Sequence, residues 1–397
     1  MPEAPLERLQ RQLIEKLSRT VSGDILAAFA NVPRHFFLPS VPLEQAYEDR
    51  AIALKHDRGW PVSTASQPSM MAIMLRQLRL QRGHNVLEIG TASGYNAALM
   101  QYLVGHDGHV TSVELDAELA RRAEVTLQAS GYGRVRVVQA DGAQGYAPRA
   151  SYDRIIATAG VWDVPPAWLR QLKPDGLLVL PIWVNGIQVS ACFSRLDDGT
   201  WASSDNHPCS FVYLRGVEAP PNFTKKLGAS GMTLLGEGLD EVDTAALAML
   251  LATDRETNYL DRFVDEVDVG KGLQLLPMLY TPPGMVFALY YLPPNVQAYG
   301  LEHSGLALIG KASAAFVPYN GRGAVETYGA SESFLALHEI VDRWYAQGKP
   351  SARHFRLRLV PFTDDDQPAP RPTALPADAA RYDRRYHTLY AWLEPTA

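Results

Sequence analysis

Short apolar runs alternate with amphipathic stretches through the first half of the chain. The runs at 86–89, 109–114, 135–139 and 152–159 end in small or polar residues, and helical patterns separate them. Short apolar runs are typical of strands buried in a parallel sheet, and their alternation with helices is typical of doubly wound α/β folds. We therefore predict a doubly wound sheet over residues 81–200.

A helical pattern precedes this region. Leu6, Leu9, Leu13 and Leu17 recur at the spacing of one helix face, and several prolines interrupt the residues that follow. The pattern predicts a helical N-terminal segment, residues 1–80, ahead of the sheet.

The second half of the chain mixes helical and strand periodicity. Apolar residues are frequent and regularly spaced there, so we predict an additional α+β domain over residues 201–397 and not a disordered tail. Residues 364–378 combine prolines with acids and alanines, which is typical of a flexible loop. The expected elements are strands at 285–291, 306–309 and 355–360 and helices at 240–251 and 331–347.

Composition narrows the class of protein. With 397 residues the chain is long enough for two cores, and 47% hydrophobic with 20% charged residues is typical of a globular protein. The net charge of −6 argues against a nucleic-acid-binding surface. We find no export signal and no apolar run that could cross a bilayer, so we expect a cytoplasmic protein with no membrane contact and a peptide or protein partner.

The cysteines and histidines do not predict a metal site. Cys192 and Cys209 are too few for a disulfide framework and too far apart for a Cys-x-x-Cys motif, and the histidines lack the spacing of a zinc site. We expect both cysteines to be buried apolar residues and expect no metal.

A turn of small residues after the first apolar run indicates a bound cofactor. Gly90, Ala92, Ser93 and Gly94 let a backbone turn approach a ligand closely at the carboxyl end of a strand. A dinucleotide site would have glycine in place of Ala92 and a third glycine further on. A nicotinamide oxidoreductase is therefore disfavoured, though it stays an alternative.

Two acids follow the next strands. Glu114 ends the second run about twenty residues after the turn, where a carboxylate can accept both hydroxyls of a ribose, and Asp141 ends the third, within reach of an adenine amino group. Nucleoside contacts without a phosphate loop favour S-adenosylmethionine. The alternative is that both acids are helix caps.

Several separate segments share their order with one enzyme family. They are residues 32–39, 46–49, 62–72, 158–160 and 169–181. Because these segments occur in the same order, residues 20–190 resemble the protein-L-isoaspartate O-methyltransferases. The resemblance implies a Rossmann-like, S-adenosylmethionine-dependent methyltransferase whose N-terminal segment covers the cofactor crevice. Ala92 replaces a glycine of the family and Ser69 replaces a histidine, and the second change concerns the segment that faces the acceptor.

The resemblance also implies roles for individual residues. Ser66 falls on the hydroxyl residue beside the substrate carboxylate and the methyl donor, and Thr64 is its neighbour, so both are candidate catalytic residues. The alternative for Ser66 is an ordinary helix cap. Substrate binding is predicted for Ser66, Thr158 and Ala159. The predicted cofactor-binding residues are Glu88, Gly90, Thr91, Ala92, Ser93, Gly94, Asn96, Glu114, Leu115, Asp141 and Gly142.

The implied reaction is methylation of an isoaspartyl or aspartyl carboxylate in a peptide or protein. The methyl ester would then collapse to a succinimide. The long extension after residue 200 resembles that of actinobacterial homologues associated with ribosomally made peptides, so a dedicated enzyme that modifies an Asp of one precursor is an alternative. A non-catalytic peptide-binding module on a methyltransferase fold is another, and the oligomeric state stays open.

Overall fold

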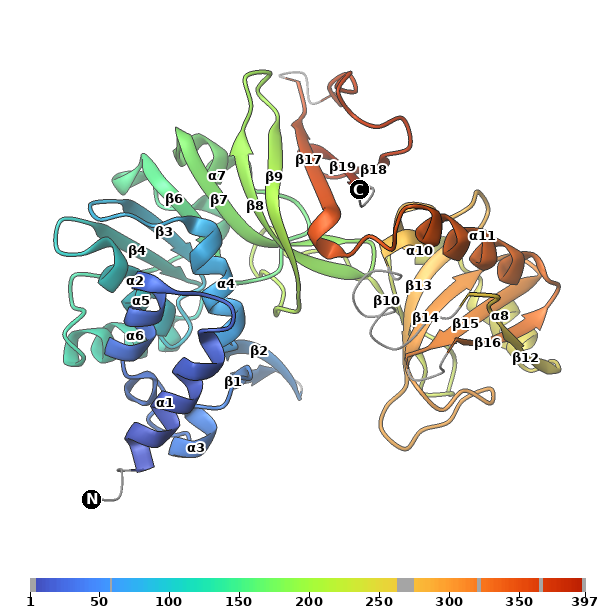
Figure 1. The fold of residues 1–397 in the computed structure, drawn as a ribbon, viewed down its shortest axis with the longest axis horizontal. Helices are drawn as coiled ribbons and strands as arrows, with labels where there is room; N and C mark the ends of the chain where they lie inside the picture. Colours follow the sequence, from blue (N-terminus) through green and yellow to red (C-terminus); the bar gives the residue numbers. More distant parts are fainter. Residues whose placement is uncertain (1–4, 58, 263–274, 320–322, 364–366, 395–397) are drawn as a thin grey trace.

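The computed structural model describes residues 5–57, 59–262, 275–319, 323–363 and 367–394 (Figure 1). Their strands form a ten-stranded sheet, a seven-stranded sheet and a two-stranded hairpin. None of the helices in these residues has the length and apolar character needed to span a bilayer.

Five parallel strands form one half of the ten-stranded sheet. They are β3 (Asn85–Ile89), β4 (His109–Glu114), β5 (Arg136–Gln139), β6 (Tyr152–Ala157) and β7 (Leu172–Val184). Their order is β5-β4-β3-β6-β7, so the direction in which strands are added reverses between β3 and β6. This arrangement confirms the predicted doubly wound sheet.

Helices cover both faces of these strands. They are α4 (Pro68–Leu78), α5 (Tyr95–Val104), α6 (Ala117–Ala129) and α7 (Pro166–Gln171). Val86 packs in one cluster with α4 and α5, whereas its neighbour Leu87 packs in another with Trp168 of α7. Adjacent strand residues point to opposite faces, which explains why the strands read as continuous apolar runs.

The N-terminal segment is helical, as its leucine spacing predicts. Leu13 and Leu17 are buried, and Leu6 and Leu9 pack against the same cluster. The segment ends in a hairpin that leads into α4. Its elements are α1 (Pro5–Leu17), α2 (Gly23–Asn31), α3 (Leu43–Ala46), β1 (Ile52–Asp57) and β2 (Trp60–Ala65).

The other half of the ten-stranded sheet is antiparallel. Its strands are β8 (Ile187–Arg195), β9 (Trp201–Cys209), β17 (Phe355–Pro361), β18 (Ala380–Asp383) and β19 (His387–Leu393). The β7–β8 turn has positive φ at Asn185 and Gly186, which two-residue hairpins favour. The sheet continues from β9 directly into β17 and β19. The structure thus differs from the predicted boundary at residue 200, because the end of the chain returns to the first sheet.

The seven-stranded sheet is antiparallel and lies between β9 and β17 in the sequence. Its strands are β10 (Thr224–Lys226), β11 (Thr233–Leu235), β12 (Arg255–Tyr259), β13 (Val286–Tyr291), β14 (Gly305–Ile309), β15 (Ser313–Pro318) and β16 (Ala324–Gly329). Its helices are α8 (Thr244–Leu251), α10 (Leu275–Leu279) and α11 (Glu332–Ala346). Leu337 of α11 packs in one cluster with Phe287, whereas Leu247 of α8 packs with Ala288, so the two helices cover opposite faces.

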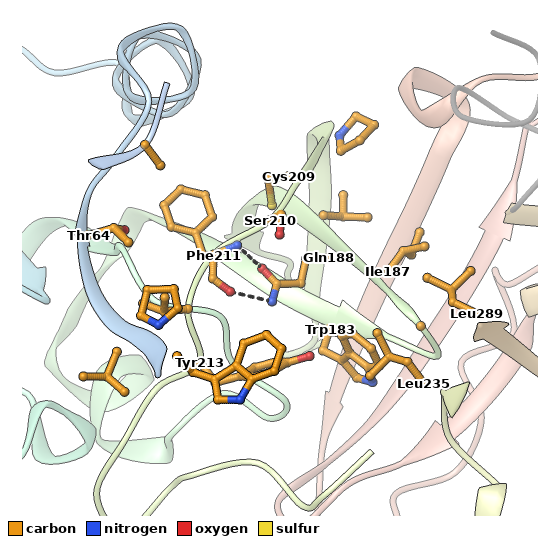
Figure 2. A pocket seen from close by; sticks show the side chains of 18 of the residues that line it. Thr64, Trp183, Ile187, Gln188, Cys209, Ser210, Phe211, Tyr213, Leu235 and Leu289 are labelled. Atoms are coloured by element: carbon orange, nitrogen blue, oxygen red, sulfur yellow. Dashed lines mark hydrogen bonds between the residues drawn. The ribbon is translucent and has the colours of Figure 1, made fainter. Parts of the chain in front are cut away.

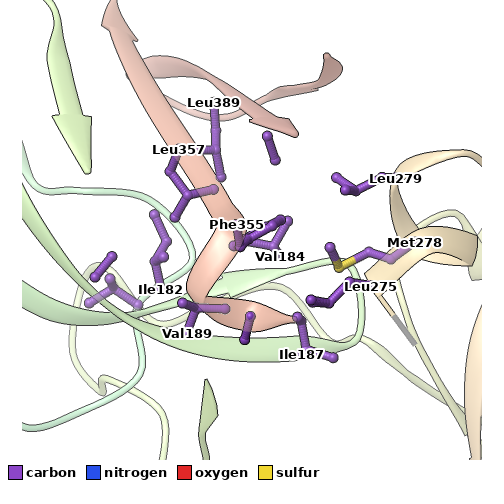
Figure 3. Close-up of a cluster of buried hydrophobic side chains, with 14 of the residues drawn as sticks. Ile182, Val184, Ile187, Val189, Leu275, Met278, Leu279, Phe355, Leu357 and Leu389 are labelled. Carbon is purple, nitrogen blue, oxygen red and sulfur yellow. The ribbon is translucent and has the colours of Figure 1, made fainter. Parts of the chain in front are cut away.

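One buried cluster joins the two sheets. Val184 and Ile187 of the β7–β8 hairpin lie near Leu275 and Met278 of α10 and Phe355 of β17 (Figure 3). All of these side chains are at most 8% exposed. Apolar burial of this kind holds the seven-stranded sheet against the β7–β8 hairpin and β17 of the ten-stranded sheet.

The predicted elements of the second half are confirmed with small shifts. The helix expected at 240–251 starts at Thr244, because the carboxylate of Asp243 accepts hydrogen bonds from the N–H groups of Ala245 and Ala246 and caps it. Within the predicted loop at 364–378, residues 364–366 lie outside the described residues, and the remainder has neither helix nor strand.

Candidate active site

A tight turn follows β3, at the point where the order of the parallel strands reverses. Gly90, Ala92 and Gly94 have positive φ angles of 98°, 48° and 83°. Open α/β sheets bind ligands at such points, beyond the carboxyl ends of the strands. A Cβ on Gly90 would lie 2.6 Å from Oγ1 of Thr158, so a larger residue would displace that side chain. Ala92 adopts the left-handed conformation with a Cβ, at a cost of about 1–2 kcal/mol.

Glu114 lies at the end of β4, beside this turn. Its Oε2 accepts a hydrogen bond from the N–H of Ala92 at 2.9 Å, and its Oε1 accepts one from the N–H of Asp116 at 3.0 Å. With Leu115 and Gly142 it lines a cavity, which we name the Glu114 cavity. Each carboxylate oxygen has room for a second hydrogen bond. The side chain can therefore accept ribose hydroxyls while it holds both turns in place.

Glu88 has a different position from the other predicted cofactor-binding residues. It is fully buried beneath the turn, where it accepts hydrogen bonds from Asn96 Nδ2 at 2.8 Å and Ser112 Oγ at 2.5 Å. The Ser112 hydroxyl also lies 2.6 Å from Oγ1 of Thr91. Burial raises the pKa of Glu88 to about 7, against the two hydrogen bonds that lower it. The structure thus places Glu88 outside the cavities, where it supports the turn from below.

Asp141 is also engaged by the protein. Its Oδ1 accepts the N–H of Ala143 at 2.9 Å, and its Oδ2 accepts the N–H of Val217 at 2.8 Å. Asp141 does not line the Glu114 cavity, although its neighbour Gly142 does. A Cβ on Gly142 would lie 2.5 Å from Cγ2 of Ile89, so the close packing of this turn requires glycine. The cap expected as the alternative is present, and the bond to Val217 adds a long-range contact.

A second cavity adjoins the first and contains the candidate catalytic serine. Ser66 lines this Ser66 cavity, and Thr64 and Thr158 line both cavities. The structure therefore brings the candidate catalytic residues to the glycine turn, although about 25 residues separate them in sequence. The other predicted residues there are Gly90, Thr91, Ala92, Ser93 and Asn96 in the Ser66 cavity and Ala159 in the Glu114 cavity.

Arg34 is a residue of this site for which the sequence predicts no role. It is buried, lines the Ser66 cavity, and donates hydrogen bonds to the carbonyl oxygens of Ala46 at 2.9 Å and Ser66 at 3.0 Å. Its guanidinium also lies 5.1 Å from the ring centroid of Tyr95. Burial lowers the pKa of Arg34, although nearby Tyr95 and Asp49 raise it. A buried cation thus fixes the backbone at Ser66.

Residues 210–217 cross over the carboxyl edge of the sheet, and we name them the covering segment. Gln188 of β8 fixes it at one end, because its Nε2 donates to the carbonyl oxygen of Phe211 at 2.9 Å and its Oε1 accepts the N–H of Phe211 at 2.7 Å (Figure 2). The N–H groups of Gly160 and Leu214 extend this pairing to the end of β6. Asp141 holds its other end through Val217. Sequence reasoning missed this segment, because no local pattern marks it.

This fold and this site define an S-adenosylmethionine-dependent methyltransferase. The Glu114 cavity brings together a close backbone turn and a carboxylate with free acceptor positions, which are groups suited to contact a nucleoside. The sequence model of the protein-L-isoaspartate(D-aspartate) O-methyltransferase family matches residues 7–219. The chain belongs to this family.

Individual relatives support the assignment. The protein-L-isoaspartate O-methyltransferase of Methanopyrus kandleri is 40% identical over 215 residues, which are 53% of this chain and 93% of that protein. That of Ignicoccus hospitalis is 42% identical over 180 residues, 45% of this chain and 83% of that protein. A solved protein-L-isoaspartate O-methyltransferase aligns over 88% of this chain and 96% of its own with a TM-score of 0.50 at 24% identity, which shows the fold. The family match ends at residue 219, close to where the seven-stranded sheet begins.

Proposed function

We propose that this chain transfers a methyl group from S-adenosylmethionine to the carboxylate of an isoaspartyl or aspartyl residue in a peptide or protein. The observation that carries the proposal is the meeting of Ser66 and Thr64 with the glycine turn around two adjoining cavities, one of which holds Glu114. Family membership supports the same reaction. Glu114 would bind the cofactor, and Ser66 would orient the acceptor.

The reaction explains why the site needs no general base. A carboxylate has a pKa near 4, so at neutral pH it is already ionised and nucleophilic. When bound, S-adenosylmethionine supplies a methyl group activated by the sulfonium. The residues of the chain need only bring the carboxylate oxygen in line with that carbon, about 3 Å away, and remove part of its water. The hydroxyls of Ser66 and Thr64 are suited to this task because they orient an anion without neutralising it.

The methyl ester formed by this transfer can react further without a catalyst. A methyl ester on the acceptor is an activated acyl group, and the following backbone nitrogen can attack its carbonyl carbon. The nitrogen gives up its proton, methanol leaves, and a succinimide ring closes. Water then opens the ring to Asp or isoAsp. The same chemistry serves repair of damaged chains and modification of a dedicated precursor.

The seven-stranded sheet favours modification of a dedicated precursor as a second candidate function. It follows the family-matched residues and packs against the edge of the core that carries the covering segment. Remote binding energy from such a surface can position one acceptor in one peptide. Transfer to isoAsp in arbitrary peptides would instead favour repair.

Labelled methyl transfer to matched Asp and isoAsp peptides, with products identified by mass, tests these functions. We expect Ser66→Ala to slow transfer at least about tenfold, because an oriented hydroxyl contributes to positioning, with cofactor affinity unchanged. Glu114→Ala should instead weaken cofactor binding by at least about tenfold, the effect of losing a charged acceptor. Ser331→Ala, at an exposed position before α11, is the control. Full activity of the Ser66→Ala variant would refute its role, and cofactor binding without any transfer would indicate a non-catalytic module.

A further inference from the structure

A cavity of about 800 Å³ lies between the two sheets. One wall is formed by Trp60 and Val62 of the β1–β2 hairpin and by the covering segment. The opposite wall is formed by Leu235 of β11 and Leu289 of β13, and Ile187 at the β7–β8 turn lies on the same side (Figure 2). We name it the apolar cavity. Neither Leu235 nor Leu289 lines the Glu114 or Ser66 cavity.

The apolar cavity adjoins the proposed methyl-transfer site. Thr64, Tyr213 and Arg215 line both it and the Glu114 cavity, and Thr64 also lines the Ser66 cavity. A peptide whose carboxylate lies at Ser66 therefore has a path along Thr64 toward the second sheet. The three cavities form one surface.

The chemistry of this wall favours an apolar occupant. Most of its lining is apolar, and Gln188, one of its polar side chains, already uses its amide oxygen and nitrogen on the backbone of Phe211. Burial raises the pKa of Cys209, so that side chain is an uncharged thiol. Burying a polar side chain here would leave its hydrogen bonds unmade, whereas an apolar one gains free energy from leaving water.

Charge complementarity indicates that this occupant belongs to an acidic peptide. Arg215 lies where the apolar and Glu114 cavities meet, and no carboxylate in the described part of the chain forms an ion pair with it. Lys55 also lies near Arg215, but Asp116 at 2.5 Å and Glu118 at 3.8 Å already compensate its charge, so Arg215 is the residue that would attract an acid here. An acceptor carboxylate, or a second acid beside it, would be attracted to this junction.

We infer that the apolar cavity binds a large apolar side chain of the acceptor peptide, close in sequence to the residue that is methylated. This inference rests on the proposed function. A sphere of the cavity's volume is about 11–12 Å across, and an extended chain rises about 3.4 Å per residue, so the cavity spans about three residues. Because Thr64 lines both this cavity and the Ser66 cavity, the enzyme selects acceptors with an apolar residue a few positions from the Asp or isoAsp.

A positional scan tests the inference directly. Peptides of Ala, Ser and Gly carry one isoAsp or Asp, and a single Phe is moved through the four positions on each side. The measurements are kcat/KM for methyl transfer and, separately, binding of each peptide to protein loaded with S-adenosylhomocysteine. We expect one position of Phe to raise both by at least about tenfold over Ala, as burial of a large apolar side chain does.

Variants of Leu289 link the preference to the cavity. Leu289→Glu places a charge in the wall, and Leu289→Gln places an uncharged polar group of similar size there, so both should reduce the preference to about twofold or less while cofactor affinity stays unchanged. Leu335→Glu, at a leucine that is 56% exposed on α11, is the matched control and should keep the preference. Leu289→Gln decides the test if Leu289→Glu fails to fold.

The outcomes separate this inference from the proposed function. Transfer with no positional preference, or a preference that both Leu289 variants retain, overturns the inference and leaves the proposed function standing. Positional binding without transfer supports the inference and refutes the function. Neither binding nor transfer refutes both. A shift from dimer to monomer in Leu289→Glu with unchanged peptide selection would assign the cavity to a second copy of the chain and overturn the inference.

Discussion

Glu88→Gln tests whether the turn is built on a protonated acid. The carboxyl of Glu88 is fully buried under the glycine turn, and its pKa of about 7 lies well above its ordinary value of 4.5. Burial is the main cause, and the charge of nearby Glu114 adds to it. A glutamine keeps the geometry, because its oxygen can accept from Asn96 and its nitrogen can donate to Ser112.

The direction in which stability changes with pH follows from the number of protons that the folded and unfolded states bind. Between pH 4.5 and 7 the folded protein holds a proton on Glu88 that the unfolded chain has released. Stability from this group is therefore complete below pH 4.5, falls as the pH rises, and is lost above about pH 7. A difference of about 2.5 pKa units corresponds to about 3 kcal/mol of unfolding free energy. The Glu88→Gln variant lacks this term, so its stability relative to the parent should rise by that amount between pH 4.5 and 8.

Urea unfolding followed by tryptophan fluorescence at several pH values measures this difference. Trp168, buried on the far face of the same sheet, is one of the seven tryptophans that contribute to this signal. Glu124→Gln, at an exposed position on α6, is the control for loss of a surface charge. A stability difference between parent and Glu88→Gln that stays constant from pH 4.5 to 8 would refute the reasoning, and so would a decrease.

Two further predictions concern residues around the turn. Arg34→Met leaves the buried carbonyl of Ala46 and the part-buried carbonyl of Ser66 without their donor, so we expect a loss of about 2–4 kcal/mol in unfolding free energy. We also expect a lower kcat with cofactor affinity retained, and an unchanged kcat in the folded variant would contradict the positioning role of Arg34. Ala92→Gly removes left-handed strain of about 1–2 kcal/mol but makes the unfolded chain more flexible at a cost of about 0.4–1 kcal/mol, so its unfolding free energy should stay the same or rise by up to about 1.5 kcal/mol. Ala92→Val should lose at least about 1 kcal/mol because a β-branched residue is strained at this φ angle, and denaturant unfolding checks both substitutions.

The parts of the fold that the sequence predicted are those with local signals. Buried parallel strands are visible in the sequence as apolar runs, and the small residues at 90–94 predict a turn, in which the structure shows positive φ angles. The same holds for α11, where Leu337, Val341 and Trp344 repeat at helical spacing and are buried. In each case the residues that define the element are neighbours in sequence.

The domain boundary failed for a different reason. β9 is rich in polar residues, and such a sequence predicts an exposed segment at the end of a domain. In the structure, however, Ser203 and Asn206 of β9 are buried. Oγ of Ser203 accepts the N–H of Leu357, and Nδ2 of Asn206 donates to the carbonyl oxygen of Phe355 at 2.5 Å. These polar side chains tie β9 to β17 across about 150 residues of sequence. Periodicity describes which face of a strand is buried, but not which distant strand it will pair with.

The candidate site shows the same limit. Glu114, Asp141 and the glycine turn were found because each follows a strand directly, and the carboxyl ends of parallel strands share one edge. Arg34 contacts Ser66 across 32 residues, and although it lies in the family-like segment 32–39, no local pattern predicts that its side chain is buried against Ser66. The sequence predicts a cofactor contact for Glu88 but does not tell which face of a central strand lies under the turn, and the structure places Glu88 beneath the turn and outside both cavities.

The covering segment lies between the cavity proposed for the cofactor and the cavity proposed for the acceptor. Asp141, on the cofactor side, holds Val217, and Gln188, beside the apolar cavity, holds Phe211. Between these anchors, Tyr213 and Arg215 line the Glu114 cavity and the apolar cavity at once. A displacement of this segment therefore changes the walls of both cavities together. If the two cavities bind acceptor and cofactor as proposed, this short stretch of backbone would couple acceptor selection to cofactor retention, and the seven-stranded sheet would influence methyl transfer without contacting the cofactor.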